Sequence, residues 1–286
     1  MQRRAVVHIG IHKTGSSSIQ QAVHGRLREL RRCGIVYPAI RNCSRLTILF
    51  RDHRERDPVV KVRGLDSPQL IADHCARLSD SLRRTLAADH RVALLSGEEL
   101  SRLTHSEVER FHSWFDGYDV HVIAYLREPR AWASSQAQQL VKAGYTLQEA
   151  VTKRALKPGF RERLSPWLTF YGRDRISVFD FDVAKLYPGG ITSHFAEQIG
   201  LPNKLKAKMA GVRVNEGLSE EAVAQLSAWN EQHTGRPSAE RLEAMQRLGG
   251  PPFVLDVEVL DRIDRQSKAD VEWVQETFGL SLYGSL

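Results

Sequence analysis

The chain is poor in cysteine and lacks a long hydrophobic run. Its 286 residues include three cysteines, Cys33, Cys43 and Cys75, which form neither a CxxC pair nor an even set for disulfides. Ordinary thiols in a reduced compartment are the simplest interpretation. The N-terminal apolar run is short, His8 interrupts it, and no small-residue cleavage site follows. Because this fits neither a signal peptide nor a membrane span, we expect a cytoplasmic protein without an integral membrane segment.

The sequence also has only a small excess of positive charge. Lys and Arg together number 41 and Asp and Glu 34, which gives a net charge of +7. This balance favours anionic ligands, but the basic residues are spread along the chain and form no stripe, so we expect no nucleic-acid partner. The sequence has no internal repeat and no low-complexity tract. It does not indicate an oligomeric state.

Short apolar runs alternate with longer amphipathic stretches. The runs lie at 5–9 (AVVHI), 34–37 (GIVY), 92–96 (VALLS), 120–126 (VHVIAYL) and 176–181 (ISVFDF). Because helical patterns separate most of them, we predict an α/β fold with a parallel sheet covered on both faces. The part from 183 to 286 is mainly helical, with amphipathic segments at 219–232 and 256–278. We expect one domain over 1–286.

The segment 40–67 interrupts this alternation. It is charged, contains FRDHRERDP and has no sustained period, which predicts a long insertion loop. Such a loop can act as a lid over a site, although an idle surface excursion is the commoner case.

The stretch VVHIGIHKTGSSSIQQAV, at 6–23, has the order strand, glycine loop, helix. Gly10 and Gly15 are spaced as in a P-loop, but the lysine, Lys13, lies between them and not after the second glycine. Backbone N–H groups of the loop, with the helix dipole behind them, would favour an oxyanion. We expect Ser17 or a neighbour to cap the helix. A Gly/Ser turn with a solvated lysine is the alternative.

The loop departs from those that bind ATP. ATP-dependent P-loops place lysine after the second glycine and use an aspartate to hold magnesium. The runs at 92–96 and 120–126 do not end in an obvious aspartate of this kind. We therefore expect no metal.

A second candidate anion site begins at the end of the run 120–126. Arg127 follows this run, and Ser135 comes eight residues later in a predicted helix. A guanidinium at a strand end and a hydroxyl one to two turns into a helix can converge on one phosphate. Taken alone, a salt-bridge arginine and a surface serine are the commoner explanation.

Together, HKTGSSS and the Arg127–Ser135 pair resemble the 5′-phosphosulfate loop and the 3′-phosphate motif of sulfotransferases. These enzymes use 3′-phosphoadenosine 5′-phosphosulfate (PAPS) as donor and release 3′-phosphoadenosine 5′-phosphate (PAP). The resemblance implies that the donor is held by Lys13, Thr14, Gly15, Ser16, Ser17, Ser18, Arg127 and Ser135. It also implies a P-loop-kinase-like, three-layer fold with about five parallel strands.

The form HIGIHKTGSSSIQ, with YGRDRISVFDFD at 171–182 and FAEQIGLP at 195–202, is most similar to the bacterial branch related to polysaccharide-modifying enzymes. This implies an acceptor hydroxyl on a carbohydrate, a glycolipid or another small molecule. The family's C-terminal nucleotide loop cannot be aligned, and the basic segment 204–217 is the nearest candidate. An ATP-dependent kinase and a non-catalytic anion- or glycan-binding relative are the alternative functions.

Related enzymes use a glutamate or a histidine as the base that deprotonates the acceptor. Glu98, first after the turn that follows 92–96, is the better match, with Glu99 and His12 as alternatives. Glu98 could instead cap the next helix, because Ser96 and Glu99 have the spacing of a capping box. His12 could assist the base or donate to the sulfonate, or could pack beside the turn without a catalytic role.

Overall fold

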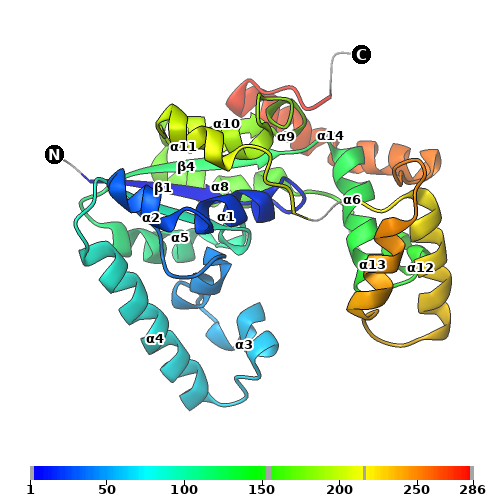
Figure 1. Ribbon diagram of the computed structural model, residues 1–286, viewed down its shortest axis with the longest axis horizontal. Helices are drawn as coiled ribbons and strands as arrows, with labels where there is room; N and C mark the ends of the chain where they lie inside the picture. The colour runs from blue at the N-terminus through cyan, green and yellow to red at the C-terminus, as the bar shows by residue number, and fades with distance from the viewer. Residues whose placement is uncertain (1–2, 153–155, 215–216, 284–286) are drawn as a thin grey trace. The chain divides into compact units, whose positions relative to one another are not determined.

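The computed structural model of the chain describes residues 3–152, 156–214 and 217–283 (Figure 1). The chain divides into two compact units. The first comprises Met1–Leu126 and Arg161–Val214, and the second comprises Arg127–Phe160 and Asn215–Leu286. The expectation of one domain stays a prediction.

The first unit is built on a five-stranded parallel sheet. Its strands are β1 (Arg4–Ile9), β2 (Ile35–Val36), β3 (Val92–Gly97), β4 (Asp119–Leu126) and β5 (Ile176–Asp180). Their spatial order is β2-β3-β1-β4-β5, so β1 is central, with Ala5 opposite Ala93 on one side and Val120 on the other. All five predicted strands are confirmed, and with them the α/β fold with a central parallel sheet of five strands.

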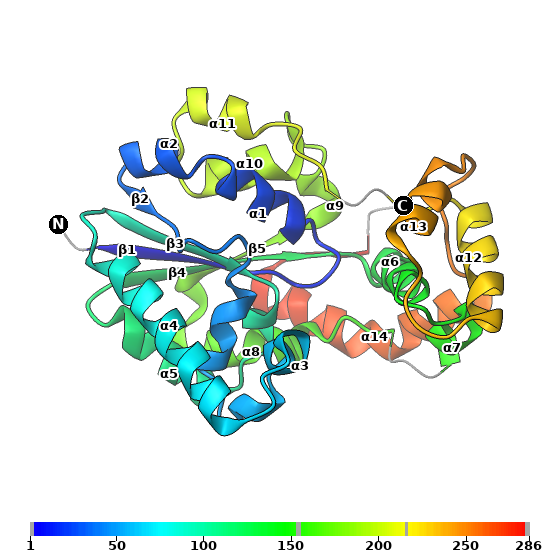
Figure 2. The ribbon, with the colours of Figure 1, turned by 60° about the horizontal axis from the view of Figure 1, so that its bottom comes forward.

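Helices cover both faces of this sheet (Figure 2). On one side are α1 (Ser16–His24), α2 (Leu27–Arg32), α10 (Gly190–Gln198) and α11 (Asn203–Met209). On the other are α4 (Pro68–Ala87), α5 (His105–His112) and α8 (Phe160–Tyr171). The central strands are therefore buried on both faces, which explains why they read as continuous apolar runs.

The first unit also contains shorter helices. They are α3 (Pro58–Arg63) and α9 (Phe181–Ala184), and the 3-10 helices η1 (Cys43–Leu49), η2 (Arg54–Arg56), η3 (Glu99–Arg102), η4 (Ser113–Phe115) and η5 (Arg173–Arg175).

The segment 40–67, predicted as a long insertion loop, contains short helices in both halves, and its first half is packed into the fold. It forms η1, η2 and α3, and η1 buries Leu46, Ile48 and Leu49. A Cβ on Gly97, at the end of β3, would lie 2.5 Å from the backbone nitrogen of Ser44, so η1 packs directly against that strand end. The sequence pattern missed this element because a 3-10 helix follows neither period used to predict helices and strands. A lid role stays a prediction.

The second unit is helical where it is described. Its helices are α6 (Pro129–Lys142), α7 (Leu147–Thr152), α12 (Glu220–Gln232), α13 (Ala239–Arg247) and α14 (Val257–Phe278). Helix α6 contributes Trp132 to one hydrophobic cluster, with Leu260 and Ile263 of α14, and Val141 to another, with Leu226 of α12. The amphipathic segments predicted at 219–232 and 256–278 are confirmed. Across the described ranges, every helix is too short or too polar to cross a membrane.

Candidate functional site

The loop between β1 and α1 has an unusual backbone. Lys13 has a φ of 69°, the one positive φ at a non-glycine position in the described part of the chain, and Gly15 follows with a φ of 77°. A side chain in this conformation is strained, and such strain clusters at ligand-binding turns. Alternation of left- and right-handed residues also turns successive amides toward one concavity. The loop is thus shaped to receive an anion beside Lys13.

The first turn of α1 carries no charge that would oppose an anion. Gly15 is its N-cap, no side chain caps the helix, and the turn contains no acidic residue. Of the expectation that Ser17 or a neighbour caps this helix, the Ser17 part is wrong: the neighbour Gly15 is the N-cap, and no side chain forms a capping hydrogen bond. The helix dipole and the uncapped amides therefore favour an external anion.

The serine and threonine hydroxyls of the loop differ in their surroundings. Thr14 Oγ1 donates to the Ile11 carbonyl at 2.5 Å, and Ser18 Oγ accepts from the backbone N–H of Val214 at 3.1 Å. Ser16 is 1% exposed, and its Oγ has no hydrogen-bond partner. A buried hydroxyl without a partner is costly. The Ser16 hydroxyl is therefore the one best placed to hydrogen-bond a ligand. The hydroxyls of Thr14 and Ser18 already form hydrogen bonds that stabilise the loop.

Gly10 makes the cradle narrow. A Cβ at this position would clash with the Ser16 hydroxyl and would lie 3.1 Å from Cγ of Glu98. Glu98 follows the end of β3, the strand that pairs with β1. The parallel pairing thus brings the predicted base beside the start of the anion loop.

His12 lies between two carboxylates. Its Nδ1 is 3.6 Å from Oε2 of Glu98, and its Nε2 is 3.4 Å from Oε1 of Glu99. All three side chains are about one-fifth to one-quarter exposed. The three residues proposed as bases therefore form one cluster next to the loop.

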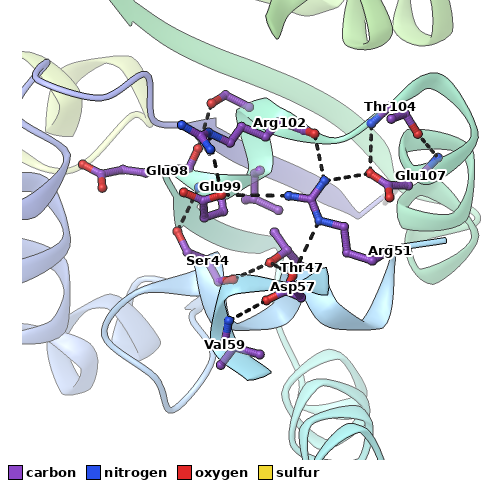
Figure 3. Close-up of polar contacts among 12 residues, drawn as sticks. Ser44, Thr47, Arg51, Asp57, Val59, Glu98, Glu99, Arg102, Thr104 and Glu107 are labelled. Carbon is purple, nitrogen blue, oxygen red and sulfur yellow. Dashed lines mark hydrogen bonds and ion pairs between the residues drawn. The ribbon is translucent and has the colours of Figure 1, made fainter. Parts of the chain in front are cut away.

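Glu99 belongs to a charged network that extends away from the loop (Figure 3). Its Oε2 lies 3.9 Å from Nη2 of Arg51 and 3.8 Å from Nε of Arg102. Burial alone would raise the pKa of Glu99, but the contacts with His12, Arg102 and Arg51 outweigh burial and lower it. Glu99 is consequently held in its ionised form. No sequence pattern pointed to Arg51, which lies in the segment predicted to be a loop.

The capping box between Ser96 and Glu99, the alternative to a catalytic Glu98, does not form. Ser96 lies in β3, and its Oγ is 2.7 Å from Nδ1 of His8. A capping box is present instead at α5, between Thr104 and Glu107. Glu98 is the N-cap residue of η3, but its side chain makes no capping hydrogen bond there, so its carboxylate is not used by the cap.

His8 lies beneath the loop, in β1. Its side chain is fully buried, and burial lowers its pKa to about 3. Its ring packs edge-on against Tyr125, with ring centroids 5.8 Å apart. A histidine that stays neutral inside the sheet is suited to a structural role.

The second predicted motif lies in the second unit. Arg127 directly follows β4 in the chain, and Ser135 is in α6. Glu128 caps this helix, because its carboxylate accepts from the backbone N–H groups of Arg130 at 2.9 Å and Ala131 at 2.7 Å. Any phosphate bound here would depend on side chains and not on helix amides. That Arg127 and Ser135 bind the same nucleotide as the loop stays a prediction.

The basic segment 204–217 is partly engaged in ion pairs. Lys206 pairs with Glu197, and Lys208 lies 3.4 Å from Glu29. The chain after α11 then returns to α1, where Val214 contacts Ser18 as described above. No sequence signal indicated that Val214 would contact α1. Lys206 and Lys208 are better explained as members of surface ion pairs than as phosphate ligands.

Comparisons with known proteins find similarity among solved structures alone. No protein-family model and no curated protein matches the chain. It is similar to a sulfotransferase from Alicyclobacillus acidocaldarius, with 16% identity and a TM-score of 0.47 over 92% of this chain and 100% of that one. It is also similar to sulfotransferase STF9 from Mycobacterium avium, with 14% identity and a TM-score of 0.37 over 99% of this chain and 79% of that one. Similarity at this level does not transfer an activity or a residue's role.

Metal ligands are not gathered anywhere in the three described ranges. No group of three or more His, Cys, Asp or Glu side chains there could hold a metal ion.

Proposed function

We propose that the protein is a PAPS-dependent sulfotransferase that transfers a sulfuryl group to an acceptor hydroxyl of a carbohydrate or glycosylated metabolite. The observation that carries the proposal is the β1–α1 loop. It combines a strained Lys13, an uncapped helix and the buried, unpartnered Ser16 hydroxyl, and it lies beside Glu98. The free thiols of all three cysteines are in keeping with a cytoplasmic site of action.

The residues present fit the donor. The cradle at Gly10 has no room for a side chain, and the Ser16 hydroxyl inside it needs a partner. The 5′-phosphosulfate would be held there by Lys13, Thr14, Gly15, Ser16, Ser17 and Ser18. The 3′-phosphate would be held by Arg127 and Ser135, because a guanidinium and a hydroxyl suit its oxygens. PAPS supplies an activated sulfuryl group and a stable leaving phosphate.

In the proposed reaction Glu98 accepts the proton of the acceptor hydroxyl. The acceptor oxygen forms a bond to sulfur, and the bond between sulfur and the bridging oxygen of the donor breaks. The electron pair of the broken bond leaves with PAP, and the other product is a sulfate ester. Lys13 and the loop amides offset the charge that grows on the leaving phosphate, which is typically worth about 3 kcal/mol, or roughly a hundredfold in rate, for one such donor.

A thermal-shift comparison of PAP, ADP and magnesium-ADP tests the donor class. We expect PAP to stabilise the protein most, by about 2.7 kcal/mol at roughly 100 times its Kd. The shift should vanish in Lys13→Ala and Arg127→Ala and persist in Lys268→Ala, which alters an exposed lysine of α14. A larger, magnesium-dependent shift with ADP would instead favour a kinase. PAP shifts that stay unchanged in both Lys13→Ala and Arg127→Ala would refute the proposed site.

Transfer of radiolabelled sulfate from PAPS to a panel of oligosaccharides tests turnover. We expect product with the wild type and at least a hundredfold less with Glu98→Gln. PAP binding without transfer to any acceptor would favour the non-catalytic relative.

A further inference from the structure

Arg51 joins three parts of the first unit through one guanidinium group (Figure 3). Its Nη1 is 2.9 Å from Oε2 of Glu107 in α5 and donates to the backbone carbonyl of Arg102 at 2.9 Å. Its Nε lies 3.5 Å from Oδ2 of Asp57, and its Nη2 lies 3.9 Å from Glu99. The side chain is 15% exposed. An arginine that is mostly shielded from water and has three acidic partners limits how far those partners can move relative to one another.

The segment that carries Arg51 has its own anchors. Asp57 accepts from the hydroxyl of Thr47 and from the backbone N–H of Val59, each at 2.9 Å. Ser44 Oγ accepts from the backbone N–H of Glu99 at 3.0 Å. Arg51 therefore extends from a well-packed support toward the end of β3.

The contacts of Glu99 differ from those of Glu98. Oε2 of Glu99 faces Arg51 and Arg102, and Oε1 faces His12. In Figure 3 the carboxylate of Glu98 points away from Arg51, and its Cγ lies next to Gly10 of the anion loop. One glutamate is thus bound into the fold, and the other faces the loop.

His12 connects the two glutamates. Because its two ring nitrogens face one carboxylate each, at 3.6 and 3.4 Å, holding Glu99 in place restricts the orientation of the imidazole. The imidazole in turn limits where the Glu98 carboxylate can lie. Arg51, Glu99, His12 and Glu98 therefore form a continuous chain that ends beside the anion loop.

We infer that Arg51 is a positioning residue for the catalytic base: it holds Glu99, which orients His12, which places Glu98 to accept the acceptor's proton. The inference rests on the proposed sulfotransferase function and goes beyond it by dividing the roles of two adjacent glutamates. Glu98 accepts the proton, and Glu99 orients the group that contacts it.

The experiment measures kcat, the KM for PAPS, and PAP affinity for the wild type and four variants. Radiolabelled PAPS is used with the oligosaccharide that the wild type sulfates fastest. The variants are Arg51→Met, Arg51→Lys, Glu99→Gln and Arg110→Met. Arg110 is a matched control, because it binds the carboxylate of Asp52 at 2.6 Å and the carbonyl of Phe50. It thus anchors the same segment without contacting Glu99.

We expect Arg51→Met and Glu99→Gln to lower kcat about tenfold while PAP affinity stays within twofold of the wild type. Arg51→Lys should recover part of kcat, because it keeps the charge but not the planar fork. Arg110→Met should keep kcat within twofold even where its melting temperature falls. Glu98→Gln, measured alongside, should lose at least a hundredfold.

Equal losses of kcat in Arg51→Met and Arg110→Met would overturn the inference, since loosening the segment would then explain both. So would a loss in Glu99→Gln that exceeds the loss in Glu98→Gln. These results leave wild-type turnover intact and so differ from failure of the proposed function, in which the wild type transfers no sulfate and the inference falls as well.

Discussion

Helix α1 follows strand β1 in the chain and helix α6 follows strand β4, and the first turns of the two helices differ in charge. The first turn of α1 has a glycine N-cap, no capping side chain and no acidic residue. The amides at the start of α6 are bound by the carboxylate of Glu128. The same order of strand, turn and helix therefore has two outcomes. The start of α1 is open to an external anion, and the start of α6 is already bound by the carboxylate of Glu128.

The difference indicates how each turn can take part in binding. At α1 the backbone itself can bind phosphate or sulfate oxygens, with Lys13 adding charge. At α6 the helix amides are occupied by Glu128, so an anion would have to be held by side chains, for which Arg127 and Ser135 are the proposed residues. A strand–turn–helix pattern alone does not identify an anion site; the residue at the cap decides.

The largest effect on PAP binding is expected when the first turn of α1 is given a carboxylate, like the one that Glu128 provides at α6. In Ser17→Asp a carboxylate enters the first turn of α1, where it would stabilise the empty helix by up to about 1 kcal/mol. It would repel the donor, and we expect PAP affinity to fall about a hundredfold, since like charges a few ångströms apart repel by a few kcal/mol near a protein surface. Isothermal titration calorimetry measures the loss. Ser17→Asn, similar in shape but neutral, should stay within about fivefold of the wild type; equal losses in both would show that charge is not the cause.

Narrowing the cradle should have a smaller effect. The added methyl group of Gly10→Ala would displace the Ser16 hydroxyl and press on Glu98. We expect PAP affinity to fall about tenfold and the free energy of unfolding by about 1 kcal/mol, the low end for overpacking. Calorimetry and chemical denaturation give the two values. Gly249→Ala, where a Cβ meets nothing within 4 Å, is the matched control, and a Gly10→Ala protein that binds PAP normally would contradict the proposed cradle.

The smallest effect on PAP binding is expected when the capping carboxylate is removed from the start of α6. Glu128→Ala removes the cap of α6 and should lower the free energy of unfolding by about 1 kcal/mol, measured by chemical denaturation. Glu128→Gln, which can still accept a hydrogen bond, should lose less. PAP binding should stay equal or tighten slightly in both, because a negative charge leaves the neighbourhood of Arg127. A tenfold loss of binding would show that Glu128 helps to bind the nucleotide and that the contrast between the turns is misjudged.

Much of the fold was predictable because its signals are local. Each strand is a run of apolar residues between polar ones, and burial on both faces of a parallel sheet gives runs without alternation. The helices α12 and α14 follow their amphipathic periods. The β1–α1 loop was found because its glycines, lysine and hydroxyls are adjacent in the chain.

The cap of α1 and the segment 40–67 were mispredicted for physical reasons. Serine is a common N-cap residue, which makes Ser17 a candidate. Gly15 can adopt the left-handed boundary conformation without steric cost, and it is the N-cap of α1. The segment 40–67 looks charged as a whole, yet its 3-10 helix η1 buries apolar residues against the end of β3. Composition averaged over a long segment hides a short buried stretch.

The sequence by itself determined the alternation of strands and helices and the make-up of the anion loop, because both depend on neighbouring residues. The tertiary structure alone decided which partners complete the site. Arg51 meets Glu107 across 56 positions of the chain, and Val214 meets Ser18 across 196. Such pairs depend on the order β2-β3-β1-β4-β5, which sets the strand ends side by side. Local pattern cannot specify that order, because it arises from the packing of the whole sheet.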